Sequence, residues 1–291
     1  MTVSKIFFDP AKPKDGVFEL QGSLKSEEGR RYEIDEWLGR GGNAAVYSCT
    51  DRGSGDPYAV KFLLSRGYRP RKRFLREVEL MKSLDNDHVI KTHGSGTVRA
   101  DEIIGTNRRP IRIPFLIMDR AQCNLTEVLD PKSTRPAPEL YMGQFRGLAG
   151  ALAQVHGSAI HRDIKPENIL VIGDRWLLSD YGLCAFLNKA AEDLTGQHGK
   201  VGPTYWLSPE AHNRRIGHPD TICAASDVYQ LAAVFWYVAT GRHPSGCLAQ
   251  SDWSGPQGLY EPIARALLHD VSKRPANGQV FLDEISAALA A

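Results

Sequence analysis

Residues 161–168 read HRDIKPEN, and residues 180–182 read DYG, a short distance further along the 291-residue chain. Together the two stretches contain carboxylates, an amide and a lysine. A carboxylate can orient a hydroxyl group, carboxylate and amide oxygens can hold Mg²⁺, and a lysine can neutralise developing negative charge. The two stretches therefore predict phosphoryl-transfer chemistry, with a polar surface loop as the plain alternative.

The composition of the chain limits the classes of function. Hydrophobic residues make up 42% of the sequence, enough for a substantial core, and the formal net charge of +2 gives no broad attraction to nucleic acid. Five cysteines lie far apart without a CxxC pair, which is typical of reduced thiols and not of a disulfide framework. The longest apolar run is far shorter than the roughly 20 residues that cross a bilayer. We therefore expect a cytoplasmic protein with no nucleic-acid or membrane partner.

The hydrophobic pattern divides the chain into a strand-rich first third and a helical remainder. Residues 1–31 mix proline, glycine and charged residues and look like an N-terminal extension, with a weak strand signal at Phe18–Leu20. Alternating or apolar stretches then predict strands at 32–38, 45–49, 58–63 and 111–118. Helical spacing predicts helices at about 71–84, 138–157, 225–240, 258–269 and 277–290. This order predicts an α+β chain with two lobes and a cleft between them.

Residues 38–46, LGRGGNAAV, form a glycine-rich segment between two expected strands. Glycines let a backbone approach phosphate oxygens closely, but a plain hairpin turn explains them equally well. The next expected strand carries Lys61 within an apolar run. A single lysine in a strand usually faces solvent. Beside a glycine-rich turn, however, it favours a site for nucleotide phosphates.

These segments resemble those of eukaryotic-type (Hanks-type) serine/threonine protein kinases. Residues 161–168 and 180–182 are similar to the catalytic and metal-binding loops of that family, and residues 39–46 follow its GxGxxGxV pattern with Ala44 as the third glycine's substitute. The resemblance covers about residues 32–288. It implies a bilobal protein-kinase fold with a small β-rich N-lobe that has one main helix, and a larger helical C-lobe. The implied boundaries are 1–31 for the extension, 32–121 for the N-lobe and hinge, and 122–291 for the C-lobe.

The resemblance implies roles for four residues of the opening stretches, with ATP and Mg²⁺ as cofactors. Asp163 would orient the acceptor hydroxyl, and Lys165 would neutralise charge on the γ-phosphate. Asn168 and Asp180 would hold the magnesium ions. We expect the chemistry of the protein to depend on these four side chains.

The nucleotide would be bound by the first lobe. Lys61 would hold its phosphates and pair with a glutamate of the following helix, for which Glu77 is favoured over Glu79. ATP would also contact a further set of residues in this lobe and its hinge, namely Leu38, Gly39, Arg40, Gly41, Gly42, Asn43, Ala44, Val46, Ala59, Met118, Asp119 and Ala121.

Other positions would support or regulate the site. Glu210 would form a buried ion pair with Arg274, and Asp227 would anchor the backbone of the catalytic loop. Arg162 precedes the catalytic aspartate, a feature typical of kinases that need a phosphate on the activation segment. Thr195 is the candidate for that phosphate, and an unmodified surface threonine is an equally favoured alternative.

The implied function is ATP-dependent transfer of the γ-phosphate to serine or threonine hydroxyls of protein substrates, with autophosphorylation. Lys165 favours the serine/threonine branch, while Glu210 and Arg274 favour protein over small-molecule acceptors. A catalytically inactive kinase fold used as a binding module and a small-molecule phosphotransferase remain the alternatives. Residues 202–207, GPTYWL, exchange a proline and a threonine relative to the family pattern, so we expect unusual peptide recognition.

Overall fold

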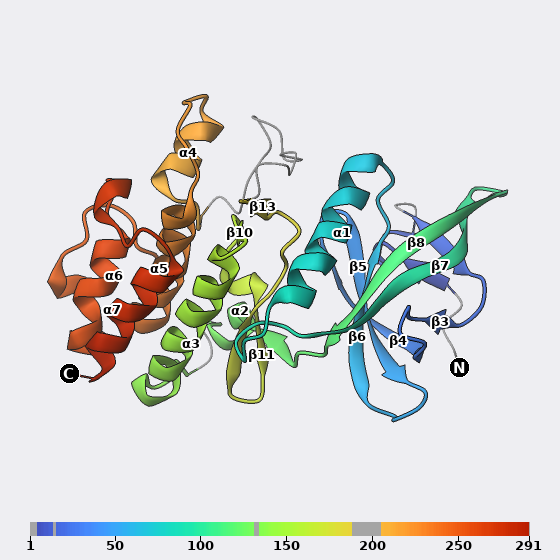
Figure 1. Cartoon of the computed structure of the whole chain (residues 1–291), viewed down its shortest axis with the longest axis horizontal. Coiled ribbons are helices and arrows are strands. Elements are labelled where there is room, and N and C mark those ends of the chain that lie inside the picture. Colours follow the sequence, from blue (N-terminus) through green and yellow to red (C-terminus); the bar gives the residue numbers. More distant parts are fainter. Residues whose placement is uncertain (1–4, 14–15, 131–133, 188–204, 291) are drawn as a thin grey trace. The chain divides into compact units, whose positions relative to one another are not determined.

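The computed structural model describes residues 5–13, 16–130, 134–187 and 205–290. It divides into two compact units: Met1–Ser83 with Lys91–Ala121, and Leu84–Ile90 with Gln122–Ala291. Figure 1 colours the chain by position, so that the first unit is mainly blue to cyan-green and the second runs from green to red.

The described part of the first unit is built on one antiparallel sheet of eight strands, in the order β1-β2-β7-β8-β6-β5-β4-β3. Figure 1 shows its long β7–β8 hairpin and helix α1 (Tyr68–Ser83), which contacts β6 and β7. The strands are β1 (Lys5–Phe7), β2 (Val17–Leu20), β3 (Leu24–Lys25), β4 (Arg31–Arg40), β5 (Ala44–Asp51), β6 (Pro57–Leu63), β7 (Thr92–Ile104) and β8 (Asn107–Asp119).

Residues 1–31, expected as an extension, contribute three strands to this sheet. Ile6, Phe18 and Leu24 are buried in the same apolar cluster as Tyr47 and Phe62 of the central strands. Burying a large apolar side chain contributes about 1.5–3 kcal/mol. The N-terminal residues therefore help to stabilise the sheet, and the weak strand signal at 18–20 corresponds to β2.

Strand β7 is absent from the sequence-based expectation, because its sequence contains two glycines and several charges that are unusual within a strand. The structure supplies the reason for both glycines. A Cβ atom at Gly94 would lie 2.9 Å from Glu28 Oε2, and one at Gly96 would lie 2.8 Å from Cζ of Phe115. Glycine within a strand often marks such a close approach.

Helix α1 begins three residues before the expected start. Pro70 occupies its first turn, where the missing backbone N–H has no intrahelical partner to lose. Phe74, Val78 and Met81 are buried, as their helical spacing predicts. The helix therefore turns one apolar stripe towards the core of its unit and leaves its basic residues at the surface.

The second unit is mainly helical. Its helices are α2 (Leu125–Val128), α3 (Pro138–His156), α4 (Pro209–Arg215), α5 (Ala224–Thr240), α6 (Tyr260–Ala266) and α7 (Gly278–Ala290). Aromatic rings join three of them, since Phe145 of α3 stacks on Phe235 of α5 at 3.9 Å between centroids, and Phe235 stacks on Phe281 of α7 at 5.9 Å. Helix α5 ends where Gly241 adopts a left-handed backbone with φ of 67°.

None of the described helices is long and apolar enough to cross a membrane.

Short strands, which the helical pattern does not indicate, position the loops of this unit. They are β9 (Cys123–Asn124), β10 (Ala159–Ile160), β11 (Ile169–Ile172), β12 (Arg175–Leu178) and β13 (Ala185–Phe186). Strand β10 leads directly into residues 161–168, which end in a 3₁₀ turn at Pro166–Asn168. Strands β11 and β12 pair in antiparallel register, so residues 168 and 179–180 lie at the same end of this hairpin.

Candidate active site

The ion pair expected between Lys61 and Glu77 is present in the first unit. Lys61 Nζ lies 2.7 Å from Glu77 Oε1, and the glutamate side chain is only 3% exposed. Glu79, the alternative partner, is exposed on another face of α1. A helix and a strand are thus joined by a charge-assisted hydrogen bond that holds the lysine in one position.

The strand register places several expected nucleotide contacts on one face of the sheet. Val46 lies opposite Lys61 across β5 and β6, and Ala59 lies opposite Met118 across β6 and β8. Because side chains alternate along a strand, these four residues share a face. Phe62, the next residue of β6, belongs to the buried cluster on the opposite face.

The glycine-rich turn joins β4 and β5. Its backbone is closed by a hydrogen bond from Gly41 N to Ala44 O at 2.8 Å. A Cβ atom at Gly39, Gly41 or Gly42 would have no neighbour within 4 Å, and none of the three has a positive φ. The fold therefore does not itself require glycine here. Open space beside a bare backbone fits a turn that receives phosphate oxygens.

We predict that Gly41→Ala separates nucleotide binding from stability. The thermal unfolding midpoint should stay within about 2 °C of the wild-type value, because no strain is introduced. The KM for ATP should rise roughly two- to tenfold, the equivalent of one lost hydrogen bond. Gly55→Ala is the matched control, since φ is 80° at this turn residue. It should lower the midpoint by about 4 °C and leave the KM unchanged. A Gly41→Ala protein with unaltered KM would contradict the prediction.

The expected hinge segment follows Asp119, the last residue of β8, and the Asp119 side chain is held by two contacts. Asp119 Oδ1 lies 2.5 Å from Nε2 of His93, and Lys91 N donates to Asp119 Oδ2 at 3.2 Å. Burial of Asp119 opposes ionisation, but the hydrogen bonds from His93 and Lys91 outweigh it, so the pKa of the carboxyl is lowered. The expected hinge contacts Asp119 and Ala121 therefore start from a fixed backbone.

In the second unit, Asp163 is the centre of a compact polar group. Its carboxylate is 7% exposed and accepts from Lys165 Nζ at 3.1 Å and from Asn168 Nδ2 at 2.8 Å. Burial is the largest influence on Asp163 and raises the pKa of its carboxyl, although Lys165 acts in the opposite direction. A buried, oriented carboxylate with one lysine beside it is suited to holding a hydroxyl group and its proton.

Asn168 and Asp180 are linked through Ser179, the residue between β12 and Asp180. Ser179 donates to the carbonyl of Asn168 twice, from its backbone N at 2.9 Å and from Oγ at 2.8 Å. Both side-chain hydrogen bonds of Asn168 use its amide nitrogen, to the carboxylate and the carbonyl of Asp163. Its amide oxygen is therefore the atom that could bind a metal. With the carboxylate of Asp180, this gives the oxygen ligands that suit Mg²⁺.

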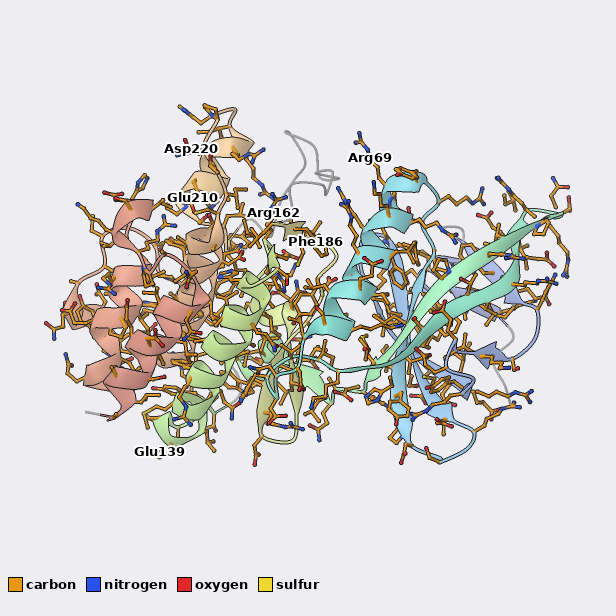
Figure 2. The ribbon with its side chains drawn as sticks, in the orientation of Figure 1. Arg69, Glu139, Arg162, Phe186, Glu210 and Asp220 are labelled. Carbon is orange, nitrogen blue, oxygen red and sulfur yellow. The ribbon has the colours of Figure 1, made fainter. Side chains whose placement is uncertain are left out.

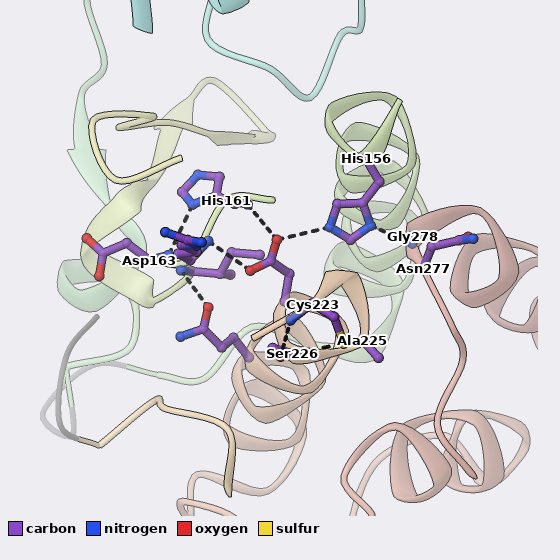
Figure 3. A network of polar contacts seen from close by, with 12 residues as sticks. His156, His161, Asp163, Cys223, Ala225, Ser226, Asn277 and Gly278 are labelled. Atoms are coloured by element: carbon purple, nitrogen blue, oxygen red, sulfur yellow. Dashed lines mark hydrogen bonds and ion pairs between the residues drawn. The ribbon is translucent and has the colours of Figure 1, made fainter. Parts of the chain in front are cut away.

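Asp227, on helix α5, anchors the start of the expected catalytic loop, residues 161–168. Its buried carboxylate accepts from the backbone N of His161 at 2.6 Å and of Arg162 at 2.8 Å, and from His156 Nε2 at 3.0 Å. Figure 3 shows His161 and His156 at either end of this network. Gln230, one helical turn further along α5, accepts from the backbone N of Ile164 at 3.2 Å. Two successive turns of α5 thus accept hydrogen bonds from three backbone N–H groups of the loop.

Both histidines of this network are neutral in their hydrogen-bonding pattern. Nδ1 of His156 accepts from Gly278 N, so Nε2 carries the proton that is donated to Asp227. His161 likewise accepts from Asp163 N and donates from Nε2 to the carbonyl of Ser179. Complete burial lowers the pKa of His161 and keeps its imidazole uncharged.

Arg162 and Asp180 have left-handed backbones, with φ of 70° and 58° respectively. They are the only described residues other than glycine with positive φ. Such a backbone costs roughly 1–2 kcal/mol for a residue with a side chain and persists where the surroundings hold it. Asp227 supplies that support at Arg162. Strain at these two positions agrees with a functional site.

Three residues that contact the site, namely Gln230, Ser179 and His156, were not predicted from the sequence. Gln230 follows Asp227 by three positions, a spacing that could have marked it as a second contact from the same helix face. Ser179 precedes Asp180 without any pattern of its own. His156 acts through its place between α5 and α7, which no local signal reveals.

The expected ion pair between Glu210 and Arg274 is present and bidentate. Nη1 and Nη2 of Arg274 lie 2.9 and 3.0 Å from the two carboxylate oxygens of Glu210, which Figure 2 labels on α4. The arginine side chain is fully buried, donates to the carbonyls of Leu268 and His269, and lies over the ring of Tyr229. Burial opposes ionisation of Glu210, but Arg274 prevails and lowers the pKa of its carboxyl.

The structure describes the end of the segment that is expected to face the substrate, from Tyr205 onwards. Thr195, the expected phosphorylation site, and the exchanged residues 203–204 lie outside the described residues. Tyr205 is 78% exposed. The next residue, Trp206, packs edge-on against Tyr237 of α5 and also contacts the ring of His243. The end of the segment is thus anchored on α5.

Comparison with known families decides the class of the chain. The protein kinase domain matches residues 32–256, more than half of the sequence. The chain belongs to the protein kinase family. The α+β kinase fold expected from the sequence is confirmed by this match and by the curled antiparallel sheet and helices described above.

Several curated relatives of this kinase domain are bacterial proteins. The probable serine/threonine-protein kinase PknB of Corynebacterium glutamicum is 29% identical over 74% of the chain and 32% of its own length. That of Bifidobacterium longum is 28% identical over 74% of the chain and 31% of its length. The serine/threonine-protein kinase PknL of Mycobacterium tuberculosis is 30% identical over 74% of the chain and 50% of its length. The kinase domain thus spans about a third to a half of these relatives.

Proposed function

We propose that this chain is a protein serine/threonine kinase that transfers the γ-phosphate of ATP to hydroxyl groups of protein substrates, and that it uses Mg²⁺. The observation that carries the proposal is the group around Asp163, where a buried carboxylate contacts both Lys165 and Asn168. The family membership and the names of the relatives support the same activity.

Each candidate site residue of the second unit has a defined role in this proposal. Asp163 orients the acceptor hydroxyl and receives its proton, and Lys165 neutralises charge that develops during transfer. Asn168 and Asp180 would hold Mg²⁺, which neutralises charge on the phosphates when it is bound. Asp227 keeps the loop in its strained conformation, so the groups need no rearrangement at the moment of reaction.

The first unit would bind the nucleotide. Lys61, held by Glu77, would contact its phosphates, and the glycine-rich turn would cover them. Val46, Ala59 and Met118 would supply an apolar surface for the base. The open space at the three glycines supports this assignment, because the fold gives no other reason for them.

Regulation and location are further parts of the proposal. We propose that Thr195 is autophosphorylated and that Arg162 receives the resulting charge, in keeping with its place before Asp163. We also propose that the enzyme acts on protein in the cytoplasm, without a nucleic-acid or membrane partner. The five free cysteines and the net charge of +2 support this location.

The activity is tested by incubating the purified chain with Mg²⁺ and γ-labelled ATP. Acceptors would be peptide pools in which serine, threonine or tyrosine is the sole hydroxyl residue, with an aminoglycoside mixture as the small-molecule acceptor. We expect label on the chain itself and on the serine and threonine pools, none of it without Mg²⁺. Label confined to the small molecules would favour the small-molecule phosphotransferase. Nucleotide binding without any transfer would favour the binding module.

A further inference from the structure

Arg40 belongs to the glycine-rich turn but lies on the opposite face from Lys61. It pairs with Ala45, which is buried in the apolar cluster, whereas its neighbour Gly39 pairs with Val46. Side chains alternate along strands, so Arg40 points away from the face that carries the expected nucleotide contacts. The Arg40 side chain therefore contacts residues that cover the other face of the sheet.

Two residues of the N-terminal segment contact the Arg40 side chain. Its Nε atom lies 3.6 Å from Oδ2 of Asp9, which is only 13% exposed, and its guanidinium lies 5.5 Å from the centre of the Phe8 ring. A cation over an aromatic face and an ion pair with a carboxylate act together here. The turn is thus attached to the N-terminal segment through its only cationic side chain.

The N-terminal segment is itself firmly attached to the strand that leaves the turn. Tyr47 of β5 accepts from the backbone N of Phe7 at 2.6 Å and donates to its carbonyl at 3.1 Å. Burial raises the pKa of Tyr47, so its hydroxyl keeps the proton that it donates. Ile6 is completely buried beside it. The backbone that precedes Phe8 and Asp9 is therefore held in place on β5, and this holds the two side chains beside Arg40.

Asp9 is also held in orientation by its own backbone. Its Oδ1 atom accepts from Ala11 N at 3.0 Å, and its carbonyl accepts from Lys12 N at 2.9 Å. These bonds form a local turn that leaves Oδ2 for Arg40. One carboxylate oxygen of Asp9 thus accepts a hydrogen bond from its own segment, and the other pairs with Arg40 of the glycine-rich turn.

We propose that Phe8 and Asp9 position the glycine-rich turn through Arg40 and thereby set the affinity for nucleotide. A turn with three glycines has many accessible conformations in the free protein, and binding must order them. Holding one of its residues in place reduces that cost. Arg40 is in this view a positioning residue and not a phosphate ligand. The inference rests on the proposed ATP binding, and its test includes a measurement without nucleotide.

Asp9→Asn is the informative substitution, because it keeps the acceptor for Ala11 and removes only the charge. Titration with a fluorescent ATP analogue should give a Kd roughly two- to fivefold weaker than wild type, with kcat unchanged. Glu19→Gln is the matched control, since Glu19 pairs with Arg108 elsewhere in the same sheet. It should leave the Kd unchanged.

The sign of the change distinguishes this role from direct phosphate binding. If Arg40 were a phosphate ligand, removal of its carboxylate partner would strengthen nucleotide binding. An unchanged or tighter Kd in Asp9→Asn would therefore overturn the proposal. A weaker Kd in Glu19→Gln of the same size would overturn it as well, because the effect would then be general.

Hydrogen exchange without nucleotide completes the test. Amides of residues 38–46 should exchange faster in Asp9→Asn than in wild type or Glu19→Gln, and equal rates would overturn the positioning role. A wild-type protein that binds no nucleotide would overturn the proposed function and the link to affinity. The exchange rates would still decide whether Asp9 positions the turn.

Discussion

Asp163→Asn is expected to lower kcat for phosphate transfer by about 10²- to 10⁴-fold. The substitution keeps an oxygen that can accept from Asn168 but removes the charge that pairs with Lys165 and the capacity to take a proton. Label transfer from ATP to the best serine or threonine peptide gives the measurement. Activity within threefold of wild type would contradict the role of Asp163.

Two comparisons make this result specific. Asp174→Asn alters an exposed carboxylate in the turn between β11 and β12, and it should leave kcat unchanged. The Kd for the fluorescent ATP analogue should stay within about twofold in Asp163→Asn, because Lys61 and the glycine-rich turn, which we propose to contact the phosphates, belong to the first unit. A large loss of binding would indicate unfolding or a role in nucleotide affinity instead.

Glu210→Gln is expected to destabilise the second unit by about 3–5 kcal/mol, because it leaves the buried guanidinium of Arg274 without its counter-charge. Four of the five tryptophans, at 176, 206, 236 and 253, lie in this unit, so fluorescence during urea unfolding reports mainly on it. Glu139→Gln, at an exposed site in the first turn of α3, should cost less than about 1 kcal/mol. Similar losses for the two substitutions would contradict the prediction.

The same ion pair predicts a dependence of stability on pH. Folding lowers the pKa of Glu210 below its unfolded value of about 4.3. The pair therefore contributes its full stability above that unfolded value and loses it as the pH falls through the lower folded pKa. In Glu210→Gln this part of the acid-induced loss should disappear. An unchanged acid profile of unfolding free energy would show that the pair does not titrate on unfolding.

The residues that could be predicted from sequence are those whose chemistry limits the choice of residue type. Lys61, Asp163 and Asp180 must be charged groups at set spacings, so a single chain reveals them. His156 illustrates the opposite case. It needs only two hydrogen bonds, one to Asp227 and one to Gly278, and both partners come from distant parts of the chain. Several other polar residue types could form two such hydrogen bonds, so the sequence alone does not single out His156 as part of the site.

The same distinction applies to the fold. The main helices were predictable because α1, α3 and α7 each bury an apolar face, while α5 is apolar and buried over almost its whole length. Strand β7 was not, since its glycines are explained by the approach of Glu28 and of the Phe115 ring, which are separate in sequence. The boundary of the first unit was also hidden, because β1 and β2 are short and gain their stability from pairing, β1 with β2 and β2 with β7.

The three N-terminal strands have a practical consequence for anyone who expresses this domain. The match to the protein kinase family begins at residue 32, and a clone trimmed to that point would lack Ile6, Phe18 and Leu24. Their removal would uncover the apolar surface of the central strands and leave the edge of β7 unpaired, which favours aggregation. The stretch that matches the protein kinase family is thus shorter than the stretch that builds the buried core of the first unit.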